Sequence, residues 1–402
     1  MRSIAVIGGG AAGMLAALTA ANDKDNRVTI FERQGRVGRK LMATGNGRCN
    51  LTNTGASVSD YHGADPEFAA YALKAFSPEK TVEFFRRLGL ICTEQYGGRV
   101  YPLSDSAGSV LDVLRFAIDR EGIELHTAEP VTHACLRNGK FCLRTETAEY
   151  RFDKVIVACG GKAGGKLGGV GDGYELLKSF GHSCTKLYPA LVPLRTDTEY
   201  PRSLKGIRAD AALKLYSGET LTAEGAGELQ FTENGISGPA AFDISREASV
   251  SGGRVVIDLF RNMTKQEILD MLIRRREMSS GMENANAFAG MLQSRLGMVL
   301  VKYAGLRPSG FLGELSSREL EKLAYSAKHF TLEIRGTDSF DSAQVTAGGI
   351  STSEFSPYTL ESRLVRGLYA CGEVLDIDGN CGGYNLQWAW ASGYLAGRLK
   401  ND

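Results

Sequence analysis

The 402-residue sequence lacks the patterns that mark several large classes of protein. None of its eight cysteines forms a C-x-x-C pair, which argues against a zinc ribbon, an iron–sulfur cluster and an adjacent dithiol. No run of 18 apolar residues is present, so no membrane-spanning helix is predicted. The 47 Lys and Arg residues balance 46 Asp and Glu residues, and a net charge of +1 gives no general attraction for nucleic acid or anionic lipid. We therefore expect a small-molecule substrate, no nucleic-acid partner and no membrane association.

The sequence also lacks a recognisable set of metal ligands or a serine nucleophile. The five histidines have no metal-binding spacing, and no metal site is predicted: His62, His126, His133, His182 and His329. The segment Gly235-Ile236-Ser237-Gly238 does not complete the G-x-S-x-G pattern of a nucleophile elbow. Four tyrosines are candidate proton donors, although core packing explains each more simply: Tyr96, Tyr101, Tyr188 and Tyr384. No catalytic residue is therefore assigned.

The cysteines are scattered singly along a long chain, which is typical of a reduced, intracellular protein. The apolar stretch Ile4–Ala21 is broken by Gly8-Gly9-Gly10 and is preceded by a single basic residue, Arg2, so we do not interpret it as a targeting signal. We expect a cytoplasmic protein. Cys49 has no partner at a fixed spacing, and a small packing residue is a better interpretation of it than a redox thiol.

Glycine is the residue present in excess, at 49 of 402 residues or about 12%, against a usual value of about 7%. The glycines occur in clusters. This distribution indicates loops in which the backbone comes close to a ligand.

The first glycine cluster lies in a strand–helix–strand unit. The apolar segment Ser3–Ile7 leads into Gly8-Gly9-Gly10-Ala11-Ala12-Gly13 and an alanine-rich helix to about Ala21. A second strand, Arg27–Phe31, ends at Glu32, 19 residues after Gly13. This order is typical of a Rossmann dinucleotide-binding unit.

Each part of this unit has an expected role towards a dinucleotide. Amides around Gly10, Ala11 and Ala12 are expected to face the phosphates at the positive end of the helix. Glu32 is expected to accept hydrogen bonds from the adenosine ribose, and its charge argues against the 2′-phosphate of NADP at this position. The motif alone leaves NAD and FAD open.

The C-terminal glycine cluster favours FAD over NAD. Gly367–Glu373 is predicted to form a buried strand that ends in Gly372 and an acid, and Glu373 would accept from a hydroxyl of the ribityl chain that only FAD has. A final apolar helix begins near Gly382-Gly383-Tyr384-Asn385-Leu386-Gln387 and offers its first amides to the flavin N1/O2 edge.

A third cluster, Gly38–Asn53, is polar, glycine-rich and directly follows the adenosine-binding unit. Lys40 or Arg48 is a candidate to neutralise a reduced flavin or a phosphate.

Between the clusters, the pattern changes along the chain. Residues 131–153 are predicted to form a three-stranded antiparallel meander with an Asn-Gly turn, and a buried strand, 154–159, leads into a glycine-rich loop, 160–173. Residues 189–260 have the short, alternating strands of a small barrel or sandwich. Residues 264–328 are predicted to be helical, with capping boxes at Thr264/Glu267 and Ser316/Glu319.

The segments "VIGGGAAGMLAA", "GRKLMATGNGRCNLTN" and "GLYACGEVLDIDGNCGGYNLQWAWASG" together resemble the bacterial BaiN/RdsA-type flavoproteins, also described as aminoacetone-oxidase-like or NAD(P)/FAD-dependent oxidoreductases. "GELQFTENGISGPA" and "TAGGIST" match as well, so the resemblance covers nearly the whole chain. It implies an α/β fold in which a Rossmann-like, glutathione-reductase-like FAD domain is interrupted by a β-barrel and a helical domain. The expected division is residues 1–188 and 343–402 for FAD, 189–261 with 330–342 for the barrel, and 262–329 for the helices.

The resemblance also implies that Val131 holds the adenine through its backbone. The loop "KAGGKLGGVGDGY" departs from the usual family pattern, so the resemblance leaves the substrate open. Together with the motifs, it gives the following predicted FAD contacts: Gly8, Gly10, Ala11, Ala12, Gly13, Glu32, Arg33, Lys40, Thr44, Gly45, Asn46, Asn50, Val131, Ala158, Cys159, Gly160, Gly372, Glu373, Gly383, Tyr384, Asn385, Leu386 and Gln387.

These observations predict an oxidoreductase with non-covalent FAD that transfers hydride between flavin N5 and a small organic substrate. The resemblance implies two activities: reduction of an enone or keto steroid-like (bile-acid) intermediate with NAD(P)H as a transient donor, and amine oxidation. The alternatives are a flavin-binding redox sensor or RNA-modification accessory, and an NAD-dependent dehydrogenase. The substrate, the donor, the acid–base residue, the direction of the reaction and the oligomeric state stay open.

Overall fold

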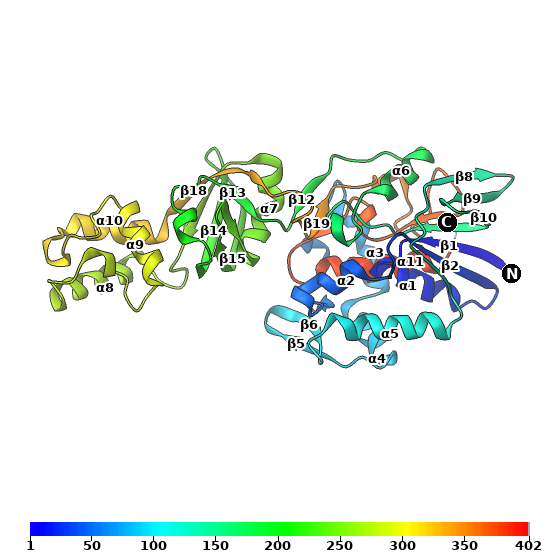
Figure 1. The fold of residues 1–402 in the computed structure, drawn as a ribbon, viewed down its shortest axis with the longest axis horizontal. Coiled ribbons are helices and arrows are strands. Elements are labelled where there is room, and N and C mark those ends of the chain that lie inside the picture. Colours follow the sequence, from blue (N-terminus) through cyan, green and yellow to red (C-terminus); the bar gives the residue numbers. More distant parts are fainter. Residues whose placement is uncertain (401–402) are drawn as a thin grey trace. The chain divides into compact units, whose positions relative to one another are not determined.

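The computed structural model describes residues 1–400 and divides the chain into two compact units. The first unit is built from Met1–Tyr188 and the chain from Gln344 on, and the second is Pro189–Ala343. The first unit therefore contains both the beginning of the chain and its last helix, which are the blue and red segments of Figure 1. No helix in the described residues has both the length and the apolar character needed to cross a membrane.

A five-stranded parallel sheet in the order β20-β11-β1-β2-β7 forms the centre of the first unit. Strands β1, β11 and β20 are nearly continuous apolar runs, as expected for a parallel sheet that is covered on both faces, whereas the edge strand β7 is polar and mostly exposed. The bounds of the strands are β1 (Arg2–Ile7), β2 (Asn26–Glu32), β7 (Glu124–Thr127), β11 (Lys154–Val157) and β20 (Leu368–Ala370). Since β20 pairs with β11 and β11 pairs with β1, the C-terminal glycine cluster lies near the first one.

Two helices from opposite ends of the chain pack tightly against each other. They are α1 (Ala11–Ala21) and α11 (Tyr384–Gly397). A Cβ at Gly393 would lie 2.4 Å from the Ala12 carbonyl oxygen, and a Cβ at Gly397 would lie 2.4 Å from that of Ala16. Glycines at one-turn spacing therefore let the backbones of α1 and α11 come into direct contact.

The rest of the first unit surrounds this centre. The predicted meander is present as β8 (His133–Arg137), β9 (Lys140–Arg144) and β10 (Glu149–Phe152), and its turn has positive φ at Asn138 and Gly139, as in a type I′ hairpin. The other strands are β3 (Thr52–Asn53), β4 (Tyr61–His62), β5 (Cys92–Gln95), β6 (Arg99–Pro102), β19 (Val345–Ala347) and β21 (Asp378–Gly379), and β12 (Tyr188–Ala190) crosses the boundary between the units. The other helices are α2 (Arg39–Ala43), α3 (Ala70–Ala75), α4 (Pro78–Arg87), α5 (Ala107–Arg120) and α6 (Asp172–Ser179).

A closed six-stranded barrel is the β part of the second unit, so of the two predicted alternatives the barrel is correct. Its strands follow the order β13-β16-β15-β14-β17-β18. Their bounds are β13 (Leu194–Thr196), β14 (Arg208–Ser217), β15 (Thr220–Phe231), β16 (Gly235–Ser237), β17 (Arg254–Asp258) and β18 (Phe330–Thr337). Helix α7 (Pro239–Ser251) packs on β15, where a Cβ at Gly225 would lie 2.4 Å from the Ala240 carbonyl oxygen.

The chain between β17 and β18 is helical, as predicted. It contains α8 (Lys265–Met278), α9 (Ser294–Tyr303) and α10 (Ser317–Lys328). Both predicted capping boxes form, with Glu267 bonded back to Thr264 and Glu319 bonded back to Ser316. The separation of this unit into a barrel domain and a helical domain stays a prediction.

Candidate functional site: the crevice at the carboxyl ends of the strands

Three neighbouring parallel strands end in a glycine cluster at the same edge of the sheet. Gly8 follows β1, the segment 158–160 follows β11, and Gly372 follows β20 within two residues. In open α/β sheets, ligands bind at this edge. We call the space bordered by these segments the crevice.

In the turn after β1, packing requires glycine at positions 8 and 13 but not at position 10. A Cβ at Gly8 would lie 2.4 Å from the Ala158 carbonyl oxygen, and a Cβ at Gly13 would lie 1.9 Å from that of Gly8. A Cβ at Gly10 would meet no atom within 4 Å. Gly10 is the N-cap of α1 and no side chain caps that helix end, so its first amides are available to an anion.

Glu32 lies at the end of β2 and is directed towards the same turn. Its carboxylate accepts hydrogen bonds from the Gly9 amide (2.8 Å) and the Gln34 amide (2.7 Å). Burial raises the pKa of Glu32, and the two amide bonds partly oppose that increase. The bonds fix the carboxylate beside the glycine turn.

Glu373 lies where the C-terminal cluster meets the first one. It follows Gly372, at which a Cβ would lie 2.9 Å from the Cβ of Ala12. Its carboxylate forms an ion pair with Lys40 (2.7 Å) and accepts a hydrogen bond from the Thr346 amide (2.8 Å). Both side chains of the ion pair are mostly buried, with 31% of Lys40 and 19% of Glu373 exposed. Glu373 therefore joins the third cluster to the C-terminal one, next to the N-terminus of α1.

The segment after β11 also reaches this carboxylate. A Cβ at Gly161 would lie 2.5 Å from Glu373 Oε1 and 2.4 Å from Thr346 Oγ1. The Thr346 hydroxyl in turn accepts hydrogen bonds from the amides of Lys162 and Ala163. Close backbone approach at Gly161 is thus required for the crevice to form.

The third cluster has a backbone that ordinary residues rarely adopt. Gly45 and Asn46 have φ values of +57° and +56°, and Cys49 has +61°. Such conformations are costly for non-glycine residues and often occur at binding sites. Asn50 follows directly, and its Oδ1 is buried without a hydrogen-bond partner.

The N-terminus of α11 lies against this cluster. A Cβ at its N-cap, Gly383, would lie 2.5 Å from the Thr52 carbonyl oxygen and 3.0 Å from Asn50 Oδ1. No side chain caps this helix end. Two clusters that are far apart in sequence therefore meet at the start of a helix, where Gly383 contacts Thr52.

Two predicted contact residues in α11 have side chains that bond within the protein. The Asn385 side chain bonds to both the amide and the carbonyl of Gly379. The Gln387 side chain is fully buried and bonds to Thr52, Thr81 and the Phe76 carbonyl. These two side chains shape the turn and anchor the helix.

The remaining predicted residues lie around the same edge. Arg33 forms an ion pair with Asp172 (2.6 Å), and Thr44 donates to the Leu41 carbonyl. Burial raises the pKa of the Cys159 thiol well above its usual range. The others are positioned by the backbone: Gly160 has a φ of +70°, Val131 and Ala158 are buried, Ala11 lies in the first turn of α1, and Leu386 lies in the first turn of α11. All the contact roles given to these residues stay predictions.

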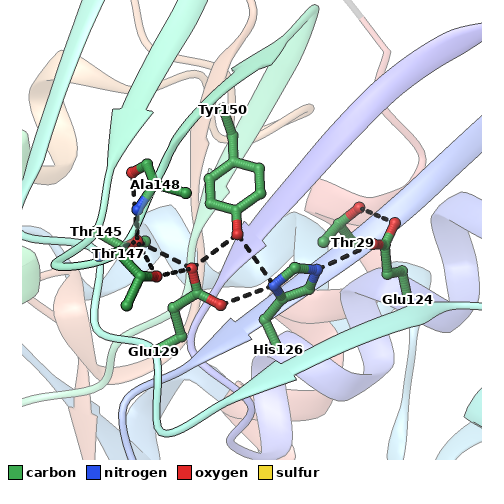
Figure 2. A network of polar contacts seen from close by, with 8 residues as sticks. All are labelled: Thr29, Glu124, His126, Glu129, Thr145, Thr147, Ala148 and Tyr150. Carbon is green, nitrogen blue, oxygen red and sulfur yellow. Dashed lines mark hydrogen bonds and ion pairs between the residues drawn. The ribbon is translucent and has the colours of Figure 1, made fainter.

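A polar network beside Glu32 was not apparent from the sequence (Figure 2). Glu129 accepts hydrogen bonds from His126 (2.8 Å), Tyr150 (2.8 Å) and Thr145 (2.9 Å). Its own amide bonds to the carbonyl of Glu32 (3.0 Å). The network thus holds the segment that leads to Val131 against β2. Its members come from β7, β10 and two loops, so no local spacing could have revealed them.

A buried serine–histidine–glutamate chain was also missed. The His182 ring is 2.9 Å from Glu354 on one side and 2.9 Å from Ser362 on the other. However, the Ser362 hydroxyl accepts from the amides of Leu364 and Val365, and the His182 side chain is fully buried. This chain therefore has the contacts of a structural anchor, with no access for a substrate.

Cys49 is fully buried, and burial raises the pKa of its thiol to about 12. It is therefore a protonated packing residue, as the sequence indicated. Among the described residues, no group of three His, Cys, Asp or Glu side chains could hold a metal ion.

Comparison with known proteins identifies the family. Residues 2–399 match the model of the "HI0933-like protein Rossmann domain". The chain belongs to the HI0933-like family. One relative in Clostridium scindens, a 3-dehydro-bile acid delta(4,6)-reductase, is 41% identical over 99% of this chain and 98% of that protein. Ribosomal RNA dihydrouridine synthases of Haemophilus influenzae and Escherichia coli are 28% and 29% identical over 97% of this chain, and over 96% and 95% of their own lengths.

This HI0933-like protein has the Rossmann-like FAD-binding fold with an inserted six-stranded barrel, and it is an FAD-dependent oxidoreductase. The family, the fold class and the enzyme class predicted from the sequence are thereby confirmed.

Proposed function

We propose that this chain holds one non-covalent FAD in the crevice and reduces an unsaturated keto steroid-like molecule with NAD(P)H as the donor. The observation that carries the substrate class is the 41% identity, over 99% of the chain, to a bile acid reductase. The geometry that supports FAD consists of two contacts. Gly372, next to the Glu373 that pairs with Lys40, lies against Ala12 in the first turn of α1, and the N-cap of α11, Gly383, lies against Asn50.

The residues present fit FAD. Gly10 leaves open space at a helix N-terminus, where amides of Ala11 and Ala12 would bind the pyrophosphate. Glu32 would accept from the adenosine ribose, and Glu373 from a ribityl hydroxyl. Val131 would hold the adenine. The unpartnered Asn50 oxygen and the uncapped start of α11 would face the ring.

When bound, FAD supplies hydride transfer at N5, and the protein supplies position and charge. Lys40 stabilises negative charge in the crevice, and Glu373 keeps the Lys40 ammonium in place through their ion pair. The helix dipoles of α1 and α11 add positive potential at the same edge. The strained segment 45–49 is held by its neighbours, so the site is formed before the ligand arrives.

A small-molecule substrate agrees better with the charge distribution than ribosomal RNA does. Between Pro189 and Ala343 there are 19 Lys and Arg residues against 20 Asp and Glu residues, a net of −1. A protein that binds RNA phosphates needs a basic surface. The segment inserted into the FAD domain has no such excess, although two relatives act on ribosomal RNA.

We also propose that the reaction takes place in the cytoplasm. No disulfide is formed among the described cysteines. A long chain with many cysteines and no disulfide is typical of a reducing compartment.

Anaerobic stopped-flow spectroscopy tests this proposal. Mixing with NADH or NADPH should bleach the flavin absorbance, and a steroid with a conjugated 3-keto group should restore it. The saturated 3-keto steroid is the control and should restore nothing. Absence of bleaching by either donor would overturn the reductase proposal, and reoxidation only by an RNA containing uridine would replace the steroid with RNA.

A further inference from the structure

Asn50 presents a buried acceptor that nothing in the protein satisfies. The residue is 9% exposed and its Oδ1 has no hydrogen-bond partner. Two other asparagine oxygens, those of Asn26 and Asn284, are also buried without partners. They lie elsewhere, whereas Asn50 belongs to the third glycine cluster and lies against the N-cap of α11. A buried carbonyl left unpaired is unfavourable, so a ligand that donates to it gains affinity.

The position of Asn50 is fixed on two sides. Cys49 before it has a left-handed backbone, and a Cβ at Gly45 would lie 2.9 Å from the Asn50 amide nitrogen. On the other side, Asn50 Oδ1 is 3.0 Å from the place that a Cβ of Gly383 would occupy. The oxygen therefore points at the N-cap of α11.

The start of α11 has the opposite hydrogen-bonding character. Amides in the first turn of a helix, here those of Asn385 and Leu386, have no acceptor within the helix, and they lie at its positive end. Donors and one acceptor thus stand side by side. A ligand that fits this pair must carry an acceptor next to an N–H donor.

The pyrimidine edge of the flavin ring has this pattern, because the C2 carbonyl adjoins N3–H. We propose that Asn50 Oδ1 accepts a hydrogen bond from flavin N3–H and so makes Asn50 the residue that selects the flavin ring. This inference deepens the proposed function and rests on FAD being the ligand of the crevice. It goes further because it names the ring atom that one side chain recognises.

The consequence is discrimination against a flavin that lacks this donor. N3-methyl-FAD keeps the adenine, the phosphates, the ribityl chain and the C2 carbonyl, but it has no N–H at position 3. Bound in the same place, it would leave Asn50 Oδ1 unpaired and would bring a methyl group against it. A site built around a hydrogen bond rejects the analogue that cannot form it.

Titration of the apoprotein with FAD and with N3-methyl-FAD, followed by flavin fluorescence, tests the inference without turnover. The wild-type protein should bind FAD at least about tenfold more tightly than N3-methyl-FAD, because the analogue leaves one buried acceptor without a hydrogen bond. This comparison needs no variant. In Asn50→Ala, FAD affinity should fall by about tenfold and the preference for FAD should nearly disappear.

Two variants guard against a general effect of the substitution. Asn50→Asp keeps an acceptor oxygen in the same place and should keep the preference for FAD over the methylated analogue. Asn284→Ala removes another buried asparagine with an unpartnered oxygen, from the second unit, and should behave as wild type.

Equal affinity of the wild-type protein for both flavins would overturn the inference while leaving FAD as the ligand. A preference for FAD over N3-methyl-FAD that persists in Asn50→Ala would also overturn the inference and leave FAD as the ligand. Failure of the wild-type protein to bind either flavin would instead overturn the proposed function on which the inference rests.

Discussion

At the scale of single residues, two carboxylates flank the glycine turn. Glu32 is the last residue of β2, on one side of β1, and Glu373 follows β20 on the other side. Glu32 is held by backbone amides, whereas Glu373 is held by Lys40 and the Thr346 amide. A substitution that removes the charge would break an ion pair at Glu373 but not at Glu32. Glu373 is therefore the better position at which to test the role of charge in the crevice.

Glu373→Gln should weaken FAD binding by about tenfold while the fold stays intact, because the amide keeps the shape but loses the ion pair with Lys40. Flavin fluorescence titration measures the affinity, and circular dichroism checks the fold. Glu175→Gln is the matched control, since Glu175 forms an exposed ion pair with Lys178 on α6 and should have no effect on affinity. Unchanged affinity in Glu373→Gln would remove this residue from the cofactor site.

Residues could be predicted wherever a short pattern carried the signal. The glycine turn, Glu32 and the packing role of Cys49 follow from local spacing or its absence, and the structure has them in the expected setting. The partners of these residues could not be predicted. The ion pair of Lys40 with Glu373 joins positions 333 residues apart, and no period in the sequence connects them.

At the scale of elements, the contact of α1 with α11 fixes the crevice. Both helices begin at an uncapped glycine at this edge, and their backbones touch at Gly393 and Gly397. The spacing of small residues allows the contact, and the sequence showed them only as part of an apolar helix. The contact positions one helix N-terminus relative to the other.

Gly393→Ala should lower the free energy of unfolding by about 1–3 kcal/mol, because its Cβ would lie 2.4 Å from the carbonyl oxygen of Ala12. This cost exceeds the gain of about 1 kcal/mol that alanine usually brings to a helix. Chemical denaturation measures it. Gly108→Ala in α5 is the control and should be neutral or stabilising, because its Cβ would approach only the Ser106 hydroxyl, at 3.2 Å. An equal effect of both substitutions would contradict close helix packing.

The network around Glu129 is a second element-level feature, and it has a pH dependence. Burial opposes ionisation, but hydrogen bonds from His126, Tyr150 and Thr145 outweigh it and lower the pKa of Glu129 to about 2. Burial also disfavours the charged His126, but Glu124 and Glu129 outweigh it and raise its pKa. Ionised Glu129 therefore stabilises the folded state above its ordinary pKa of 4.5, and this stabilisation is lost as the pH falls towards 2. Protonated His126 stabilises the folded state below its ordinary pKa of 6.5, and this stabilisation is lost as the pH rises through its raised pKa.

Glu129→Gln should therefore lower the melting temperature by several degrees, with the largest deficit between about pH 4.5 and 6.5 and a smaller one on either side. Calorimetry across this range measures it. Glu146→Gln, an exposed residue of the same meander, is the control and should show no such profile. A deficit that does not change with pH would show that the His126–Glu129 pair does not contribute through its charge.

Elements could be predicted where turn and cap chemistry is local. The Asn138-Gly139 turn and both capping boxes formed as expected. The family resemblance implied a barrel, but the strand pattern alone could not predict its closure, because closure depends on β13 pairing with β18, as in Leu194 with Thr337. The alternating pattern of the strands is the same in an open sandwich and in a closed barrel.

At the scale of the whole molecule, the first unit is completed only by the end of the chain. β20 joins β11 in the sheet after more than 200 intervening residues, and α11 then returns to α1. The resemblance of the two terminal clusters to known flavoproteins predicted this arrangement, and the periodicity of the strands alone would not have done so.

The most direct test of the account is the identity and amount of nucleotide that the purified chain carries. We predict a yellow protein that releases about one FAD per chain on denaturation, or an apoprotein that takes up FAD to that ratio and melts at a higher temperature when loaded. A colourless chain that takes up no FAD under any condition, and that binds NAD at the glycine turn instead, would contradict the account.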